Sequence, residues 1–130
     1  MILKNNLSNI FGIKLQTSIL DNQEVFNALK KIDSSRLKLI INIAGRSKLD
    51  IEELVKKYES LNFQELLLET GFQAYPTDLA DSGLSKIKYL KDNFKYKVVF
   101  ADHIDGKLKE AITLPLVASV CGAGYIEKHI

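Results

Sequence analysis

Short apolar stretches alternate with longer amphipathic stretches along the chain. The short stretches are rich in β-branched and aliphatic residues, whereas the longer ones place apolar residues at helical spacing. The apolar runs are Gly12 to Leu15, Leu37 to Ile43, Glu65 to Leu68, Lys97 to Phe100 and Gly124 to Ile126. Their starts recur at intervals of roughly 25 to 35 residues, the size of one strand-plus-helix unit. The pattern therefore predicts about five βα units.

Three of the longer stretches carry an apolar stripe along one helical face, and each stripe is expected to face the core. The stripes are Val25, Leu29 and Ile32; then Ile51, Leu54, Val55 and Tyr58; then Leu84, Ile87 and Leu90.

Two helix boundaries can be predicted from local signals. Ser47 and Asp50 form a capping-box pattern just before Ile51, and Gly122 suits the end of a helix. Pro115 disfavours a helix interior, because it lacks a donor and clashes with the preceding turn. The helix before Gly122 is therefore expected either to start near Pro115 or to bend there, and we favour a late start after a loop that begins at Asp105.

The strand-like runs LKLIINI and ELLLE are apolar without clean alternation. Strands that are covered on both faces by crossover helices have this composition, so a parallel sheet of the α/β class is predicted. Closed barrels and open doubly wound sheets both satisfy the pattern, and periodicity does not separate them.

Composition limits the classes of function. The chain has 130 residues, of which 46% are hydrophobic and 26% charged, as in one ordinary globular domain spanning 1–130. Its formal charge of +2 is small and its lysines are dispersed, which argues against nucleic acid as a partner. Cys121 is the single cysteine and no secretory signal or membrane-spanning run is found, so a cytoplasmic location is expected.

Acidic and imidazole side chains follow two consecutive predicted strands. Ala101, Asp102 and His103 come after the fourth run, and Glu127, Lys128 and His129 come after the fifth. If these strands are neighbours about 4.8 Å apart, the two imidazoles can meet at one metal ion, with Asp102 or Glu127 orienting them. The same spacing also suits two solvent-exposed histidines, so the pattern alone leaves both interpretations open.

Polar groups near two other strand ends are candidates for anion binding. Lys14 lies inside an apolar strand, where an ammonium is costly to bury unless an anion or a polar mouth is close, although an edge position would also explain it. Thr17 could donate to the same anion, or could be an ordinary turn residue. Gln73 and Tyr75 follow the third run in a segment that equally suits a structural turn.

Several short motifs occur in this chain in the same order as in a known protein family, and their order is more specific than any single motif. The chain resembles the N-acetylneuraminate (sialic acid) synthase family, including its spore coat polysaccharide relatives, from Gly12 to Ile130. The shared motifs are YPT, DH and IEKH, within the segments IKLQTS, LIINIAG, LLLETGFQAYPT, VVFADHIDG and GAGYIEKHI. The resemblance implies a (β/α)8 TIM barrel that condenses phosphoenolpyruvate with an N-acetylated mannose-type sugar, aided by a divalent metal that is typically manganese, with magnesium as the alternative.

The resemblance also implies roles for individual residues. His103 and His129 match the family's metal ligands, and Lys14 matches its phosphoenolpyruvate-binding lysine, with Thr17 at the position of a serine. Gln73 and Tyr75 fall where the family places polar contacts to phosphate and sugar.

This sequence departs from the family at several positions. Ile43, Thr70 and Ala101 stand where the family has a serine, a histidine and a serine. The family's first three βα units, with an essential glutamate, have no counterpart here, and a complete barrel takes about 250 residues. We therefore expect a partial TIM barrel of the last five strands, inactive by itself, that forms a homo-oligomer or binds a complementing chain. The alternative is a noncatalytic interaction module.

Overall fold

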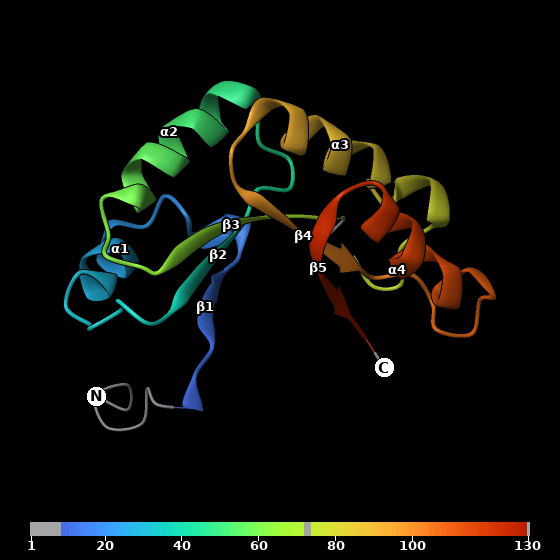
Figure 1. Ribbon diagram of the computed structural model, residues 1–130, viewed down its shortest axis with the longest axis horizontal. Helices are drawn as coiled ribbons and strands as arrows, with labels where there is room; N and C mark the ends of the chain where they lie inside the picture. The colour runs from blue at the N-terminus through green and yellow to red at the C-terminus, as the bar shows by residue number, and fades with distance from the viewer. Residues whose placement is uncertain (1–8, 72–73, 130) are drawn as a thin grey trace. The chain divides into compact units, whose positions relative to one another are not determined.

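The computed structural model describes residues 9–71 and 74–129, which form an α/β fold with a five-stranded parallel sheet and four α-helices (Figure 1). The strands are hydrogen-bonded in the order in which they occur in the sequence, as predicted. The elements are β1 (Gly12–Leu15), α1 (Gln23–Leu29), β2 (Lys38–Asn42), α2 (Lys48–Glu59), β3 (Glu65–Thr70), α3 (Leu84–Asn93), β4 (Lys97–Asp102), α4 (Glu110–Val120) and β5 (Ala123–Lys128), with short 3₁₀ turns at Thr17–Ile19 and Leu79–Asp81.

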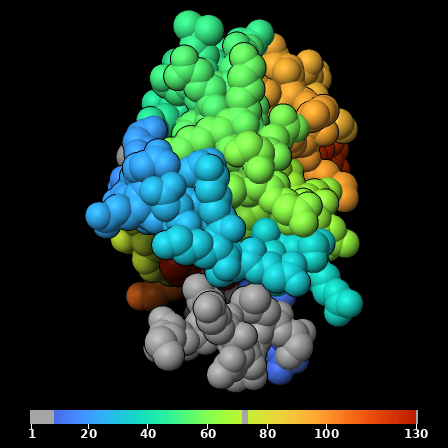
Figure 2. All heavy atoms as spheres, turned by 90° about the vertical axis from the view of Figure 1, so that its left-hand side faces the viewer, coloured from blue at the N-terminus to red at the C-terminus, as the bar shows by residue number. Residues whose placement is uncertain are grey.

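The chain divides into two compact units, of which the first ends at Leu67 and the second begins at Leu68. In the first unit, β1 pairs in parallel with β2, so that Lys14 lies opposite Ile40. The stripe predicted on α2 is buried, as expected, and the outer sides of α1 and α2 face the viewer in Figure 2. Full burial of one large apolar side chain contributes about 1.5–3 kcal/mol to the stability of the fold.

The start of α2 follows from the predicted capping box. The Ser47 hydroxyl accepts from the Asp50 backbone N–H at 3.2 Å, and the Asp50 carboxylate accepts from the Ser47 backbone N–H at 3.0 Å. Two N–H groups that have no partner within the helix are satisfied in this way.

The stripe predicted on the first helix is only partly correct. Helix α1 ends at Leu29, so Ile32 lies beyond it, and Phe26 is buried while Val25 is half-buried. The Phe26 ring packs edge-on against the ring of Tyr58, with centroids 5.7 Å apart. The buried face of α1 is therefore formed by Phe26 and Leu29, and not by the predicted stripe that includes Val25.

The second unit contains β4, β5 and the helices α3 and α4 that pack on them. Strand β4 is buried from Val98 to Asp102 on both faces, which explains its apolar composition without alternation. Strands β4 and β5 are parallel, and Asp102 lies opposite Lys128 after a register irregularity between Val98 and Val99. The two strands therefore end side by side.

The expected late start of α4 is wrong. The helix begins at Glu110, and Pro115 lies inside it. Ala111 and Leu114, on the turn before the proline, are only 5% and 3% exposed, so core packing stabilises that turn. The proline removes one intrahelical hydrogen bond early in the helix, and burial of these two side chains offsets that loss.

The end of α4 agrees with the prediction. Gly122 follows the C-cap residue Cys121 with a φ of 107°, and its N–H donates to the carbonyl of Ser119 at 3.0 Å. This left-handed conformation favours glycine and turns the chain directly into β5.

Helix α4 is apolar on both sides. Ala111, Leu114 and Ala118 face the core, whereas Ile112, Leu116 and Val120 are 78%, 66% and 89% exposed. Exposed side chains four residues apart form a continuous stripe on the helix. Among the described residues, no helix combines the length and the apolar character needed to cross a membrane.

Candidate metal centre

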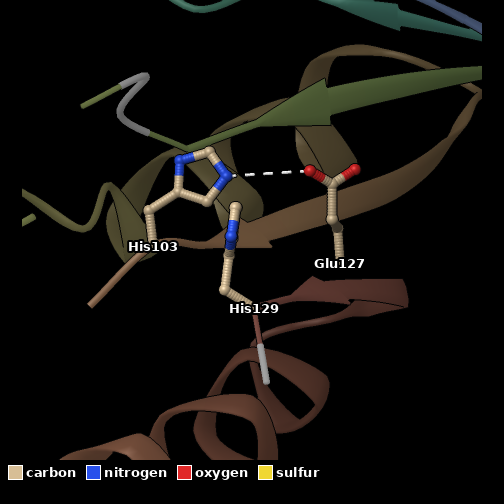
Figure 3. Close-up of side chains that lie close together, drawn as sticks. All are labelled: His103, Glu127 and His129. Carbon is tan, nitrogen blue, oxygen red and sulfur yellow. Dashed lines mark ion pairs between the residues drawn. The ribbon is translucent and has the colours of Figure 1, made fainter. Parts of the chain in front are cut away.

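Two imidazoles and a carboxylate meet where β4 and β5 end (Figure 3). His103 directly follows β4, Glu127 lies near the end of β5, and His129 follows it. One nitrogen or oxygen atom from each of the three side chains lies within 4.8 Å of the others. The parallel pairing of the strands thus brings together residues that are far apart in the sequence.

The three side chains face one another. The His103 Nε2 lies 3.6 Å from the Glu127 Oε1, and the two imidazole rings have centroids 4.9 Å apart at an angle of 78°. His103 is buried, Glu127 is half-buried and His129 is exposed, so the cluster opens to solvent on one side. An ion held here could also reach a small molecule.

Successive side chains of a β-strand point to opposite faces of the sheet, which explains which residues near the end of β5 belong to the cluster. Glu127 and His129 are two residues apart and share one face of β5, whereas Lys128 points to the other face. There the Lys128 ammonium lies 2.6 Å from the Asp102 carboxylate, whose other oxygen accepts from the Ile104 N–H at 3.2 Å. These contacts of Asp102 hold the strand ends together. Of the two acids expected to orient an imidazole, Glu127 is the one that lies beside His103.

Tyr75 covers His129. The two rings are stacked, with centroids 4.6 Å apart and an interplanar angle of 24°. The following segment is held at β4, because the Thr77 N–H donates to the His103 carbonyl at 2.8 Å and its hydroxyl donates to the Ala74 carbonyl at 2.5 Å. Tyr75 is thereby placed at the cluster, whereas Gln73 lies outside the described residues.

The donor set fits a divalent metal. Two imidazole nitrogens with one carboxylate oxygen are ligands that zinc, manganese and iron accept, and three protein ligands leave coordination positions open. Residues His103, Glu127 and His129 could therefore hold an ion that also binds a substrate oxygen.

Comparison with known proteins identifies the family. The model of the NeuB family matches residues 13–130. The chain belongs to the NeuB family. The resemblance drawn from the YPT, DH and IEKH motifs is thus confirmed.

Relatives of this NeuB-family chain are longer than it is. An N-acetylneuraminic acid (sialic acid) synthetase from Leptospira borgpetersenii, solved with citrate, matches with a TM-score of 0.74 and 27% identity over 93% of this chain and 39% of that one. A protein assigned to spore coat polysaccharide biosynthesis (protein E) from Chromobacterium violaceum matches with a TM-score of 0.72 and 22% identity, over 90% and 33% of the two chains. An uncharacterized protein of Methanocaldococcus jannaschii is 32% identical over 101 residues, which cover 78% of this chain and 28% of that protein.

The fold therefore corresponds to part of a TIM barrel, as expected from the sequence. The chain spans between 28% and 39% of the length of these three relatives.

The predicted anion-binding residues of this NeuB-family chain lie in its first unit. Lys14 is a half-buried residue of β1, and Thr17 opens the 3₁₀ turn that follows. The Thr17 hydroxyl donates to the Ala44 carbonyl at 3.2 Å and accepts from the Arg46 Nε at 3.2 Å. The guanidinium of Arg46 also bonds the Asp21 carboxylate at 2.7 Å. Thr17 is thus a member of an internal polar network.

Sequence reasoning missed Arg46. Arg46 comes four residues after β2, a position where the carboxyl-terminal rule for parallel strands could have indicated it. Glu127, which was expected to orient an imidazole, lies 3.6 Å from His103, and its oxygen is also one of the three clustered atoms that could bind a metal.

Proposed function

We propose that this chain is part of a phosphoenolpyruvate-dependent sialic-acid-type synthase, which condenses phosphoenolpyruvate with an N-acetylated sugar. The single observation that carries the proposal is the cluster of His103, Glu127 and His129 at the ends of β4 and β5 in a NeuB-family chain. The carboxyl ends of parallel strands are where TIM-barrel proteins bind their substrates.

In this proposal, His103 and His129 bind a divalent ion, of which Mn²⁺ is favoured over Mg²⁺ because imidazole is a better ligand for transition metals. The ion would supply Lewis acidity to the aldehyde of the open-chain sugar. The ring of Tyr75 holds His129 in position and is exposed enough to contact the sugar. Lys14, with Thr17, is the proposed anchor for phosphoenolpyruvate.

A second candidate function is a noncatalytic module that binds another chain. The apolar stripe of α4, formed by Ile112, Leu116 and Val120, favours it, because exposed apolar surface of this kind promotes association. A homo-oligomer or a complementing chain would cover the stripe in either function.

The deciding experiment measures phosphate release from phosphoenolpyruvate with N-acetylmannosamine and Mn²⁺. The 130-residue chain is assayed alone and after mixing with the amino-terminal βα units of a family member. We expect no turnover by the chain alone and turnover by the mixture, which His103→Ala abolishes. If a mixture that forms a complex shows no turnover, the noncatalytic function is the better description.

A further inference from the structure

We propose that a basic hollow at the amino ends of β4 and β5 binds a small phosphate ester. The hollow lies within the second unit and has a volume of about 320 Å³, which is large enough for a small ligand. It is lined by the end of α3, the start of β4 and the turn from α4 into β5. The proposal goes beyond the synthase function and does not depend on it.

Lysines dominate the lining of the hollow. Lys91, Lys95 and Lys97 bring three ammonium groups to it, and none of the described residues that line it is acidic. The carboxyl-terminal ends of α3 and α4 are close by, and a helix end of this kind carries a partial negative charge of about half a unit. Because the three lysines outweigh that partial charge, the hollow attracts an anion.

Gly122 leaves room for one of these ammonium groups beside the backbone. A Cβ at Gly122 would lie 2.6 Å from the Lys91 Cδ and 3.1 Å from its Nζ, so the Lys91 side chain lies across the turn between α4 and β5. Any larger residue at this position would displace the lysine. The turn therefore places the Lys91 ammonium beside a stretch of bare backbone.

Gly124 forms a bulge in β5 at the same place. Val98 of β4 pairs with Ala123 and Val99 pairs with Tyr125, so Gly124 is left without a register partner. A glycine inside a strand often marks a bulge or a point where a ligand approaches the backbone closely. Gly124 is exposed and lines the hollow, so a ligand can reach the backbone here.

Aromatic rings add an apolar wall to the hollow. Phe94 and Tyr96 are half-buried and line it between the lysines. The Lys95 ammonium lies 5.4 Å from the centre of the Tyr96 ring, within the range of a cation–π contact. Ammonium groups beside aromatic rings can bind both parts of a phosphate ester, its charged group and its organic group.

The hollow lies at the opposite end of β4 and β5 from the candidate metal centre. Lys97 is the first residue of β4, whereas His103 directly follows its last residue. Catalytic residues of TIM barrels lie at the carboxyl ends of the strands. A ligand at the amino ends would therefore bind without taking part in a reaction at the cluster.

The test titrates the full ¹⁵N-labelled chain with phenyl phosphate and with inorganic phosphate, and follows the backbone amide signals of Gly122 and Gly124. We expect both signals to shift at millimolar concentrations of either probe. Phenyl phosphate should bind about two- to tenfold more tightly, because its ring can pack on the aromatic wall. Equal affinities would overturn the assignment to an ester and leave inorganic phosphate as the ligand.

Two variants separate the contribution of charge from that of shape. Lys91→Gln should weaken the binding of phenyl phosphate by about two- to fivefold, the usual effect of one exposed ion pair. Gly124→Val keeps every charge and should abolish binding, because its side chain occupies the hollow. A Cβ at Gly124 lies no closer than 3.7 Å to its neighbours, so this variant should fold, as circular dichroism can verify.

Lys88→Gln is the matched control. Lys88 is an exposed lysine of the same helix as Lys91, it pairs with Asp92 at 2.6 Å, and it is not among the residues that line the hollow. Its replacement should leave the affinity unchanged. If it weakens binding as much as Lys91→Gln does, or if Gly124→Val still binds phenyl phosphate, the anion is held by general surface charge and the proposal fails.

Lys14→Gln separates this proposal from the proposed function. Lys14 is the proposed anchor for phosphoenolpyruvate and belongs to the first unit. The shifts of the Gly122 and Gly124 signals should persist in this variant. Their disappearance, or their absence in the unaltered chain, would overturn the site at the amino ends of β4 and β5 and leave the synthase proposal untouched.

Discussion

The Lys128 ammonium lies 2.6 Å from the Asp102 carboxylate, and the two residues are register partners on β5 and β4. The Asp102 side chain is fully buried, whereas that of Lys128 keeps 28% of its exposure. The pair ties the ends of the two strands together, one residue before each imidazole.

Removing the ammonium should destabilise the protein. Lys128→Met leaves the Asp102 carboxylate buried without its cation, and breaking a buried ion pair costs roughly 3–5 kcal/mol. The partial exposure of Lys128 places the expected loss in unfolding free energy near the lower limit. Urea denaturation measures it, with the exposed Lys107→Met as the control. Adding Asp102→Asn to Lys128→Met should recover part of the loss, and no recovery would contradict this account.

The stack of Tyr75 on His129 should matter for metal binding. Tyr75→Ala removes a contact worth about 0.5–1.5 kcal/mol, which corresponds to about two- to tenfold weaker Mn²⁺ binding. Tyr75→Phe retains the ring and should bind Mn²⁺ as the unaltered chain does. Calorimetry of both variants tests this role, which would be refuted if they had equal affinities.

Gly71 should tolerate no side chain. Its φ is 142°, and a Cβ there would collide with the Ala101 carbonyl oxygen on β4. Gly71→Ala should lower the unfolding free energy by about 1–3 kcal/mol, the usual cost of overpacking. Gly106→Ala is the matched control, because nothing lies within 4 Å of its Cβ position. Thermal unfolding of the two variants should separate them clearly.

The capping box of α2 should make stability depend on pH. Hydrogen bonds from the Ser47 side chain and then from its backbone N–H lower the pKa of Asp50 below its usual value of 3.8. The contribution of Asp50 to stability is complete above that usual value, and it is lost as the pH falls through the lowered pKa. Asp50→Asn should therefore reduce stability near neutral pH, and its effect should shrink as the pH falls below 3.8. Urea unfolding over this range, with Asp92→Asn for comparison, measures the difference.

The exposed stripe of α4 should promote self-association. Ile112→Ser and Val120→Ser together remove the two most exposed apolar side chains of the helix and should shift the protein toward the monomer. Sedimentation velocity at micromolar concentration follows the change. If the unaltered chain is already monomeric and binds no hydrophobic dye, the stripe has no such role.

The positions of the strands were predictable because buried parallel strands need continuous apolar residues, as in LKLIINI. The capping box was predictable because Ser47 and Asp50 act on the backbone within one turn. The start of helix α4 was not predictable from the sequence. It depends on tertiary contacts that bury Ala111 and Leu114, and these contacts outweigh the tendency of Pro115 to disrupt a helix.

The candidate site was predictable only in part, for a similar reason. Consecutive strand ends suggested that His103 and His129 would meet. The position of Glu127 was harder to predict, because it depends on the face of the sheet to which its side chain points. The contact of Thr17 with Arg46 was not predictable, because the two residues are 29 positions apart in the sequence.

The three candidate ligands come from a single strand–helix–strand segment, β4–α4–β5. Selection for metal affinity would therefore act on a short stretch of the gene, and changes in the first unit would be nearly neutral for that trait. A random mutagenesis library sorted by zinc retention should show this asymmetry. Intolerant positions would cluster between Lys97 and His129, with changes before Leu68 recovered far more often.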